Sequence, residues 1–252
     1  MVETPRIGNI KLEERHSEKK SVNLREYIVQ RKNYLVLKRI FDIVLSVFIL
    51  LFIFSWLFPI LYILIKLDSR GPVFFVQKRV GFLGRSFPCL KFRTMYVNDE
   101  ANTRQAVDND PRVTRMGRFL RNSNLDELPQ FLNVLAGHMS IVGPRPHMYK
   151  DCANFSNVVN AYKFRNLMKP GITGLAQVKG YRGPAQSFDQ IFRRYQWDAF
   201  YVRNATFWLD IRIVHSTAMQ TLSYLLSKFI VIEDVPLATV KPEWIEPQNV
   251  LN

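Results

Sequence analysis

A run of apolar residues in the first quarter of the chain limits what it can fold into. Residues 40–65 read IFDIVLSVFILLFIFSWLFPILYILI, and Asp42 is the only charged residue among them. A helix of this length rises about 39 Å at 1.5 Å per residue, more than the roughly 30 Å hydrocarbon core of a bilayer. A core helix of a soluble protein is seldom apolar on every face for so long. The run therefore predicts a helix embedded in a membrane.

Basic residues flank the apolar run on both sides. Residues 1–39 contain ten Lys or Arg and five Asp or Glu, and residues 66–93 contain seven Lys or Arg and one Asp. Because basic flanks remain in the cytoplasm, residues 39–67 are predicted to form a re-entrant helix–break–helix that enters and leaves on the same face. A kinked helix that spans the bilayer is the alternative, since proline is common in such helices.

Pro59 is the predicted site of the break. A proline ring clashes with the carbonyl group four residues earlier, which here belongs to Ser55. The Ser55 hydroxyl offers a hydrogen bond to backbone groups that the break frees. Ser55 and Pro59 are therefore the residues expected to form the bend.

Three further parts complete the chain. Residues 1–38 form a basic segment in which Asn23–Leu37 has the pattern of an amphipathic helix on a membrane surface. Residues 68–230 are predicted to form a cytosolic domain. Residues 231–252 contain three prolines and are expected to form a loose tail.

The cytosolic domain is predicted to be of the α+β class, mostly helical and small, with one short β-hairpin. The hairpin pairs Val73–Val80 with Phe87–Met95 across the glycine-containing turn at residues 81–84. Gly143-Pro144-Arg145-Pro146 is expected to be a rigid, extended loop. Helical patterns cover Met116–Arg121, Leu125–Leu135, Phe188–Arg203 and Phe207–Leu226. The last of these suits a second interfacial amphipathic helix.

The net charge of +14 implies an anionic partner: nucleic acid, acidic lipid headgroups or phosphorylated substrates. The sequence has no recognisable nucleic-acid-binding motif, and a deep membrane anchor disfavours that class, so we expect no nucleic-acid partner. The two cysteines, Cys89 and Cys152, and the four histidines have no zinc-ligand spacing.

Asp126 and Glu127 form an acidic pair in or just before the first turn of an expected helix. One interpretation is a helix cap whose charge suits the helix dipole. The other is a reactive site, because adjacent carboxylates can share a divalent cation with substrate phosphates. Four basic residues on turns and element ends are candidate phosphate ligands: Lys91, Arg93, Arg121 and Arg145.

Seven stretches between Lys38 and Ile213 form a recognisable series. They are KRIFDIVLS, IKLDSRGPVFFVQKRVG, KFRTM, NDPRVTRMGRFLR, LDELPQFLNVLAGHMSIVGPRP, KPGITGLAQVKGYRG and DAFYVRNATFWLDI. In these stretches the sequence resembles the bacterial sugar transferase family, also called monotopic phosphoglycosyl transferases. They run in family order, which makes the resemblance far more specific than any one motif.

The resemblance implies a reaction and roles for the residues. Asp126 would attack the diphosphate of a UDP-sugar, release UMP and pass the sugar phosphate to polyprenyl (undecaprenyl) phosphate. Glu127 would help position a Mg²⁺ ion or handle protons, and both carboxylates are candidate Mg²⁺ ligands. Lys91, Arg121 and Arg145 match basic pocket positions of the family. Further pocket candidates are Pro144, Pro146 and Asp198.

The same resemblance implies a location: the bacterial inner membrane, with the catalytic domain on its cytoplasmic face. It also implies a place in the first membrane step of exopolysaccharide, capsule, O-antigen or glycoconjugate assembly. Two positions depart from the family. Ser55 and Pro59 lie four residues apart where many relatives have them adjacent, and Leu175 stands where many have Trp.

Other readings remain open at this stage. A membrane-surface scaffold for polysaccharide export would explain the charge and the anchor, but not the acidic pair together with GPRP. The sequence leaves open the sugar, the glycan pathway and the oligomeric state, a homo-oligomer included.

Overall fold

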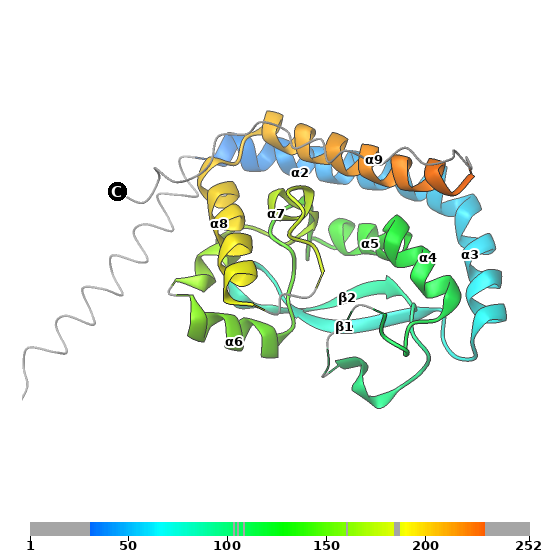
Figure 1. Ribbon diagram of the computed structural model, residues 1–252. Helices are drawn as coiled ribbons and strands as arrows, with labels where there is room; N and C mark the ends of the chain where they lie inside the picture. The colour runs from blue at the N-terminus through cyan, green and yellow to red at the C-terminus, as the bar shows by residue number, and fades with distance from the viewer. Residues whose placement is uncertain are drawn as a thin grey trace, which may run out of the picture. The chain divides into compact units, whose positions relative to one another are not determined.

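The computed structural model describes residues 31–102, 104, 106–107, 109–159, 161–183 and 187–229 (Figure 1). The tail at 231–252 and most of the segment at 1–38 lie outside these residues. The chain divides into two compact units, residues 1–41 and 42–252. In the first unit, the described residues form the beginning of helix α2 (Lys32–Ile49).

The apolar run is helical from end to end but changes its geometry halfway. Helix α2 passes into a π-helical turn, η1 (Leu50–Phe54), and then into α3 (Ser55–Asp68). Residues Lys32–Asp68 together are long and apolar enough to cross a membrane by length and composition. Figure 1 shows α3 leaving the direction of the preceding helix. A π turn is one of the recognised causes of such a bend.

The irregular turn lies ahead of the residues expected to form it. Pro59 is inside α3, where the backbone is assigned as regular helix. The Ser55 hydroxyl donates to the carbonyl of Leu51, and the Trp56 indole nitrogen donates to the carbonyl of Phe52 at 2.8 Å. Both acceptors belong to the π turn. Ser55 therefore hydrogen-bonds to irregular backbone, but this backbone precedes Ser55 and does not lie at Pro59.

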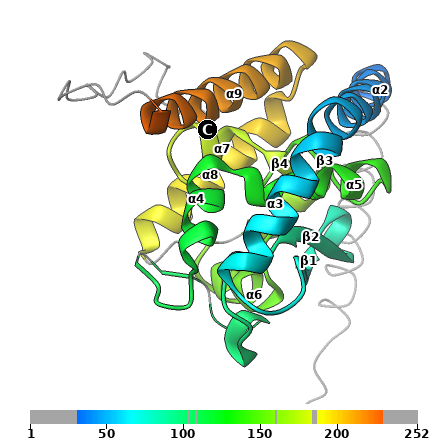
Figure 2. The same cartoon turned by 90° about the vertical axis from the view of Figure 1, so that its right-hand side faces the viewer.

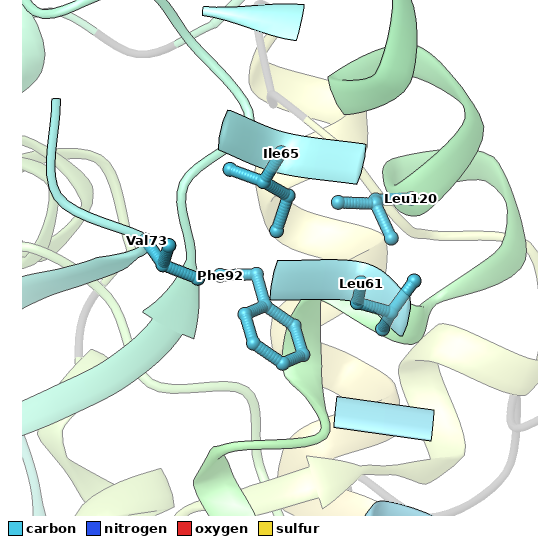
Figure 3. Packing of buried hydrophobic residues seen from close by; sticks show 5 residues of the cluster. All are labelled: Leu61, Ile65, Val73, Phe92 and Leu120. Carbon is cyan, nitrogen blue, oxygen red and sulfur yellow. The ribbon is translucent and has the colours of Figure 1, made fainter. Parts of the chain in front are cut away.

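One face of α3 is part of the core of the domain. Leu61 and Ile65 are each 2% exposed and pack with Val73, Phe92 and Leu120 (Figure 3). The opposite face carries exposed apolar residues, among them Ile60, Ile63 and Leu67. The second half of the apolar run therefore packs in the same hydrophobic core as residues that follow it in the sequence.

The predicted β-hairpin is confirmed. Strands β1 (Phe74–Val80) and β2 (Ser86–Phe92) are antiparallel and are joined through a short turn, η2 (Phe82–Gly84). Phe58 of α3 stacks on Phe74 with a centroid distance of 5.6 Å, and Phe74 stacks on Phe92 at 5.6 Å. These ring contacts attach α3 to one face of the hairpin and leave the other face available.

Two short helices and a turn follow the hairpin and a brief 3₁₀ turn, η3 (Asp99–Asn102). Helix α4 (Arg115–Ser123) is capped by the Thr114 side chain, which accepts from Gly117 N at 2.9 Å. It ends at Asn124 in the left-handed conformation. The 3₁₀ turn η4 (Leu125–Glu127) and helix α5 (Gln130–Leu135) then replace the single helix expected over Leu125–Leu135.

A second, parallel two-stranded sheet was not predicted. It pairs β3 (Ser140–Val142), which precedes the GPRP loop in the sequence, with β4 (Gly171–Thr173), which follows that loop and the segments after it. The two strands approach closely, since a Cβ on Gly171 would lie 2.1 Å from Gly143 N. Also unpredicted are α6 (Tyr149–Val158), the 3₁₀ segment η5 (Tyr162–Leu167) and α7 (Leu175–Val178).

The last two helices match their predicted ranges closely. They are α8 (Phe188–Asn204) and α9 (Phe207–Phe229). Figure 2 shows α9 lying across the domain, where it contacts α4, α7 and the small parallel sheet. Its outer face exposes Trp208, Met219, Leu222 and Leu226, the pattern expected of an interfacial helix.

Candidate active site

An open cavity of about 770 Å³ lies against the face of the hairpin that α3 leaves uncovered. Phe75, Gln77 and Arg79 line it from alternate positions of β1, and Lys91 lies opposite Phe75 on β2. Its other walls come from α4, η4, the loop after β2, the start of α6 and α8. Nine Lys or Arg residues and four Asp or Glu residues of the described chain line it. The excess of positive charge suits an anionic ligand.

The acidic pair is held in this cavity by the hydrophobic residues on either side of it. Leu125 and Leu128 pack against the core cluster that contains Phe92 and Leu120. Asp126 and Glu127, between them, line the cavity and are 7% and 4% exposed. The alternation of apolar and acidic residues in LDEL therefore places both carboxylates at the cavity wall.

Glu127 is clamped by two basic side chains. Lys91 Nζ lies 2.7 Å from Glu127 Oε1, and Arg145 donates to both carboxylate oxygens, at 2.7 and 3.4 Å. Burial by itself raises the pKa of this carboxyl, but Arg145 and Lys91 outweigh it and hold the pKa of Glu127 well below its usual range. Glu127 is therefore ionised and has little freedom to move.

Asp126 is much less constrained than its neighbour. Lys91 Nζ lies 3.5 Å from its Oδ2, and its Oδ1 accepts no hydrogen bond from any described residue. Burial raises the pKa of the Asp126 carboxyl, while Lys91 opposes the rise. The site thus contains one anchored carboxylate and one carboxylate with an oxygen that meets no donor among the described residues.

Arg145 is positioned by residues that do not reach the cavity. Arg165 NH2 donates to the Arg145 carbonyl at 2.6 Å, and Arg165 forms an ion pair with Asp198 at 2.7 Å. Asp198 is 2% exposed and is not among the residues lining the cavity. Its place in the structure is therefore a support for the Arg145 loop and differs from the pocket position expected of it.

Arg121 reaches the cavity because α4 packs very closely against the end of the hairpin. A Cβ on Gly117 would lie 2.0 Å from the Thr94 carbonyl oxygen, so only glycine fits there. One turn later, Arg121 Nε donates to Thr94 Oγ1 at 2.8 Å. This bond leaves the rest of the Arg121 guanidinium at the cavity wall, as expected of a phosphate ligand.

The remaining candidates make mainly backbone contacts. Arg93 donates to the carbonyls of Ser69 and Arg70, at 2.6 and 2.8 Å, and so caps the end of α3 while also lining the cavity. The Pro144 carbonyl accepts from Gly171 N at 3.0 Å, and the Pro146 carbonyl accepts from Arg79 NH1 at 3.1 Å. Neither proline lines the cavity. The two prolines instead brace the loop that carries Arg145.

Sequence reasoning missed several residues that line the cavity. They are Arg79, His147, Asp151, Arg182 and Arg194. Arg79 could have been found, because its spacing of two from Gln77 puts both side chains on one face of a strand. The others come from distant segments that only the tertiary fold brings together.

The residues present fit a divalent cation only if the substrate supplies further ligands. The described residues contain no group of three or more His, Cys, Asp or Glu that could hold a metal ion. Mg²⁺ is commonly bound by one or two carboxylates together with substrate phosphates. The unpaired Oδ1 of Asp126, next to Glu127 in a basic cavity, suits that arrangement.

Comparison with known proteins agrees with the family resemblance. Residues 33–224 match the family described as bacterial sugar transferase. The chain is 46% identical over 204 residues to the UDP-glucose:undecaprenyl-phosphate glucose-1-phosphate transferase of Xanthomonas campestris pv. campestris, covering 80% of this chain and 42% of that protein. It is 44% identical over 194 residues to the exopolysaccharide production protein PSS of Rhizobium leguminosarum bv. phaseoli, covering 75% and 96%.

A third relative is similar over most of its own length. The UDP-glucose:undecaprenyl-phosphate glucose-1-phosphate transferase of Caulobacter vibrioides is 41% identical over 187 residues, covering 74% of this chain and 70% of that protein. The chain therefore spans less than half the length of the Xanthomonas relative but most of the Rhizobium and Caulobacter ones.

Proposed function

This chain belongs to the bacterial sugar transferase family, and we propose that it transfers a sugar 1-phosphate from a UDP-sugar to undecaprenyl phosphate. The products are undecaprenyl diphosphate sugar and UMP. The names of the relatives support this reaction, and two of the three name UDP-glucose as donor. Glucose is therefore the first sugar to test.

The observation that carries the mechanism is the contrast between the two carboxylates. Asp126 has an oxygen with no hydrogen bond from the described residues, whereas Glu127 is held at 2.7 Å by both Lys91 and Arg145. A nucleophile needs a free lone pair. We assign that role to Asp126 and assign to Glu127 the role of holding two cations beside it.

The reaction is then two displacements at one phosphorus atom. Asp126 attacks the sugar-bearing phosphorus of the donor, the bond to the bridging oxygen breaks, and UMP leaves with that oxygen. An oxygen of undecaprenyl phosphate then attacks the aspartyl phosphosugar, and the Asp126 carboxylate is released. Lys91, Arg121 and Arg145 line the cavity where charge would develop on the phosphoryl oxygens, and cations in such positions stabilise it.

Mg²⁺ is part of the proposal. Asp126 and Glu127 are the residues that would hold it together with the donor diphosphate. When bound, the ion would neutralise negative charge on the phosphoryl oxygens. The excess of lysine and arginine around the carboxylates meets part of the same need.

We propose that the apolar helix enters the inner membrane as a re-entrant segment and that the domain lies on the cytoplasmic face. Basic flanks on both sides, the π turn at Leu50–Phe54 and the bend support this placement. Single cysteines near positions 20 and 240, introduced after removal of Cys89 and Cys152, should label from the same side of the membrane. Labelling from opposite sides would contradict the re-entrant path and leave the chemistry untouched.

The covalent step is tested by omitting the lipid acceptor. Enzyme incubated with a UDP-sugar alone should release up to one UMP per active site and gain the mass of a phosphosugar on the peptide containing Asp126. Asp126→Asn should form no adduct and should melt at the wild-type temperature, because Asn has nearly the same shape and the 3.5 Å contact to Lys91 is weak. UMP release only when both substrates are present, with no adduct, would instead favour direct attack by the lipid phosphate.

A further inference from the structure

Asp151 lies in the first turn of α6, on a different element from the acidic pair, and lines the cavity. The residue is 8% exposed, and its carboxylate accepts no hydrogen bond from any residue in the described part of the chain. Its oxygens are not among the fully buried polar atoms without a partner, so they are open to the cavity. A ligand in the cavity that donates hydrogen bonds can therefore reach them.

Two arginines line the same cavity, and neither donates a hydrogen bond to this carboxylate. Arg79 is held by its bond to the Pro146 carbonyl, and its charge and that of Asp151 influence each other. Arg194, on α8, is 6% exposed, donates to the Gly183 carbonyl at 2.8 Å and also lines the cavity. The cavity therefore offers both a carboxylate acceptor and guanidinium donors, a pair of functions that suits hydroxyl groups, which both donate and accept.

The chemistry of the two substrates decides which of them can bind to Asp151. A lipid phosphate consists of an anion, which a carboxylate repels, and a hydrocarbon chain, which has no hydrogen-bond donor. A nucleotide sugar has hydroxyl pairs on both its hexose and its ribose. Only the donor substrate therefore has groups that can satisfy Asp151.

We infer that Asp151, together with Arg79 and Arg194, forms a subsite that binds a vicinal hydroxyl pair of the nucleotide sugar. The inference rests on the proposed function and adds a specificity-determining position to it. Arg79 connects the subsite to the reacting centre, because it donates to the carbonyl of Pro146, the residue after Arg145, at 3.1 Å. A sugar or ribose bound at Asp151 would be attached to a diphosphate that reaches toward Asp126.

Asp151→Asn tests the inference in the full-length enzyme in detergent or lipid discs. Loss of hydrogen bonds to a charged acceptor should raise KM for UDP-glucose about ten- to hundredfold with little change in kcat. Asp151→Glu should also raise KM, because its carboxylate is displaced by one methylene. If Asp151 only interacted with the helix dipole, Asp151→Glu should have wild-type kinetics, because Glu suits a first helical turn as well as Asp does.

Asp189→Asn is the matched control. Asp189 also lies in the first turn of a helix, α8, but its side chain is 68% exposed and does not line the cavity. Asp189→Asn should leave KM for UDP-glucose unchanged. If the wild-type enzyme is active and both Asp151 variants keep its KM, the inference about Asp151 is wrong but the proposed function stands. Absence of UMP release by the wild type from any UDP-sugar would overturn the proposed function instead.

Inhibition by UMP and dUMP distinguishes the sources of the hydroxyl pair. If the hexose binds at Asp151, Asp151→Asn raises KM for the donor but leaves inhibition by UMP unchanged. If the ribose binds there, the variant weakens UMP, and dUMP inhibits wild type and variant equally. Equal weakening of UMP and dUMP by the variant would indicate contact with the uracil base and would refute hydroxyl recognition.

Discussion

Truncating Ile65 tests whether the second half of the apolar helix is part of the domain core. Ile65 is 2% exposed and packs in one cluster with Leu61, Phe92 and Leu120 (Figure 3). Ile65→Ala removes three buried carbon atoms and leaves a cavity between α3, β2 and α4. Such changes cost about 2–5 kcal/mol. For a domain of this size, each kcal/mol lowers the melting temperature by about 2–4 °C, so a fall of roughly 4–20 °C is expected.

Ile63→Ala is the matched control, because it removes the same atoms from the same helix. Ile63 is 56% exposed, so its truncation leaves no cavity in the domain and should change stability by about 0.5 kcal/mol or less. The helix-propensity gain is the same for both changes and cancels in the comparison.

Unfolding can be followed through the thiol of Cys89, which is 2% exposed and becomes reactive toward a fluorogenic dye when the hairpin opens. Cys152→Ser in the background of both variants restricts the signal to that site. Equal melting temperatures for the Ile65 and Ile63 variants would refute the shared core and would favour an anchor that packs independently of the domain.

Three other outcomes follow from the site and its supports. In the proposed reaction Asp126 acts when it is ionised, so activity is lost as pH falls through its pKa. Lys91 lowers that pKa, and Lys91→Gln should therefore move the acid limb of the pH–activity profile to higher pH. An unmoved limb in the normalised profile would contradict this. A chelator should abolish UMP release and added Mg²⁺ should restore it, because the acidic pair must approach a diphosphate; full activity after thorough metal depletion would remove the metal from the mechanism. Gly117→Ala should destabilise the protein by about 1–3 kcal/mol, because the new Cβ would lie 2.0 Å from the Thr94 carbonyl oxygen. A wild-type melting temperature would show that this contact relaxes at no cost.

The sequence predicted those features that have a local cause. The hairpin follows from alternating apolar and polar residues around a glycine turn, and β1 and β2 begin and end within a few residues of the expected ranges. Helices α8 and α9 have sustained helical periodicity, and their bounds were nearly right. Glu127, Lys91 and Arg145 belong to motifs of the family and were expected in one pocket, but the ion pairs of Glu127 with the two basic residues were not predicted.

The features that were missed depend on contacts between distant segments. Strands β3 and β4 have three residues each and no period that distinguishes them from a loop; they form because Gly143 and Gly171 allow two backbones to meet. Arg93 was expected to bind phosphate, but the end of α3 lies beside it, and three of its bonds go to Ser69 and Arg70. A charge in a motif does not reveal which neighbour will take its hydrogen bonds.

The single charged residue of the apolar run links that run to the strand before the Arg145 loop. Asp42 is 2% exposed, and its Oδ1 accepts hydrogen bonds from Ser140 Oγ at 3.1 Å and Ile141 N at 3.0 Å. A carboxylate is tolerated in such surroundings only when donors satisfy it. Ser140 begins β3, and the loop that follows this strand carries Arg145, which binds Glu127 at 2.7 Å. The helix segment from residue 42 onward is therefore hydrogen-bonded to the strand from which the Arg145 loop departs.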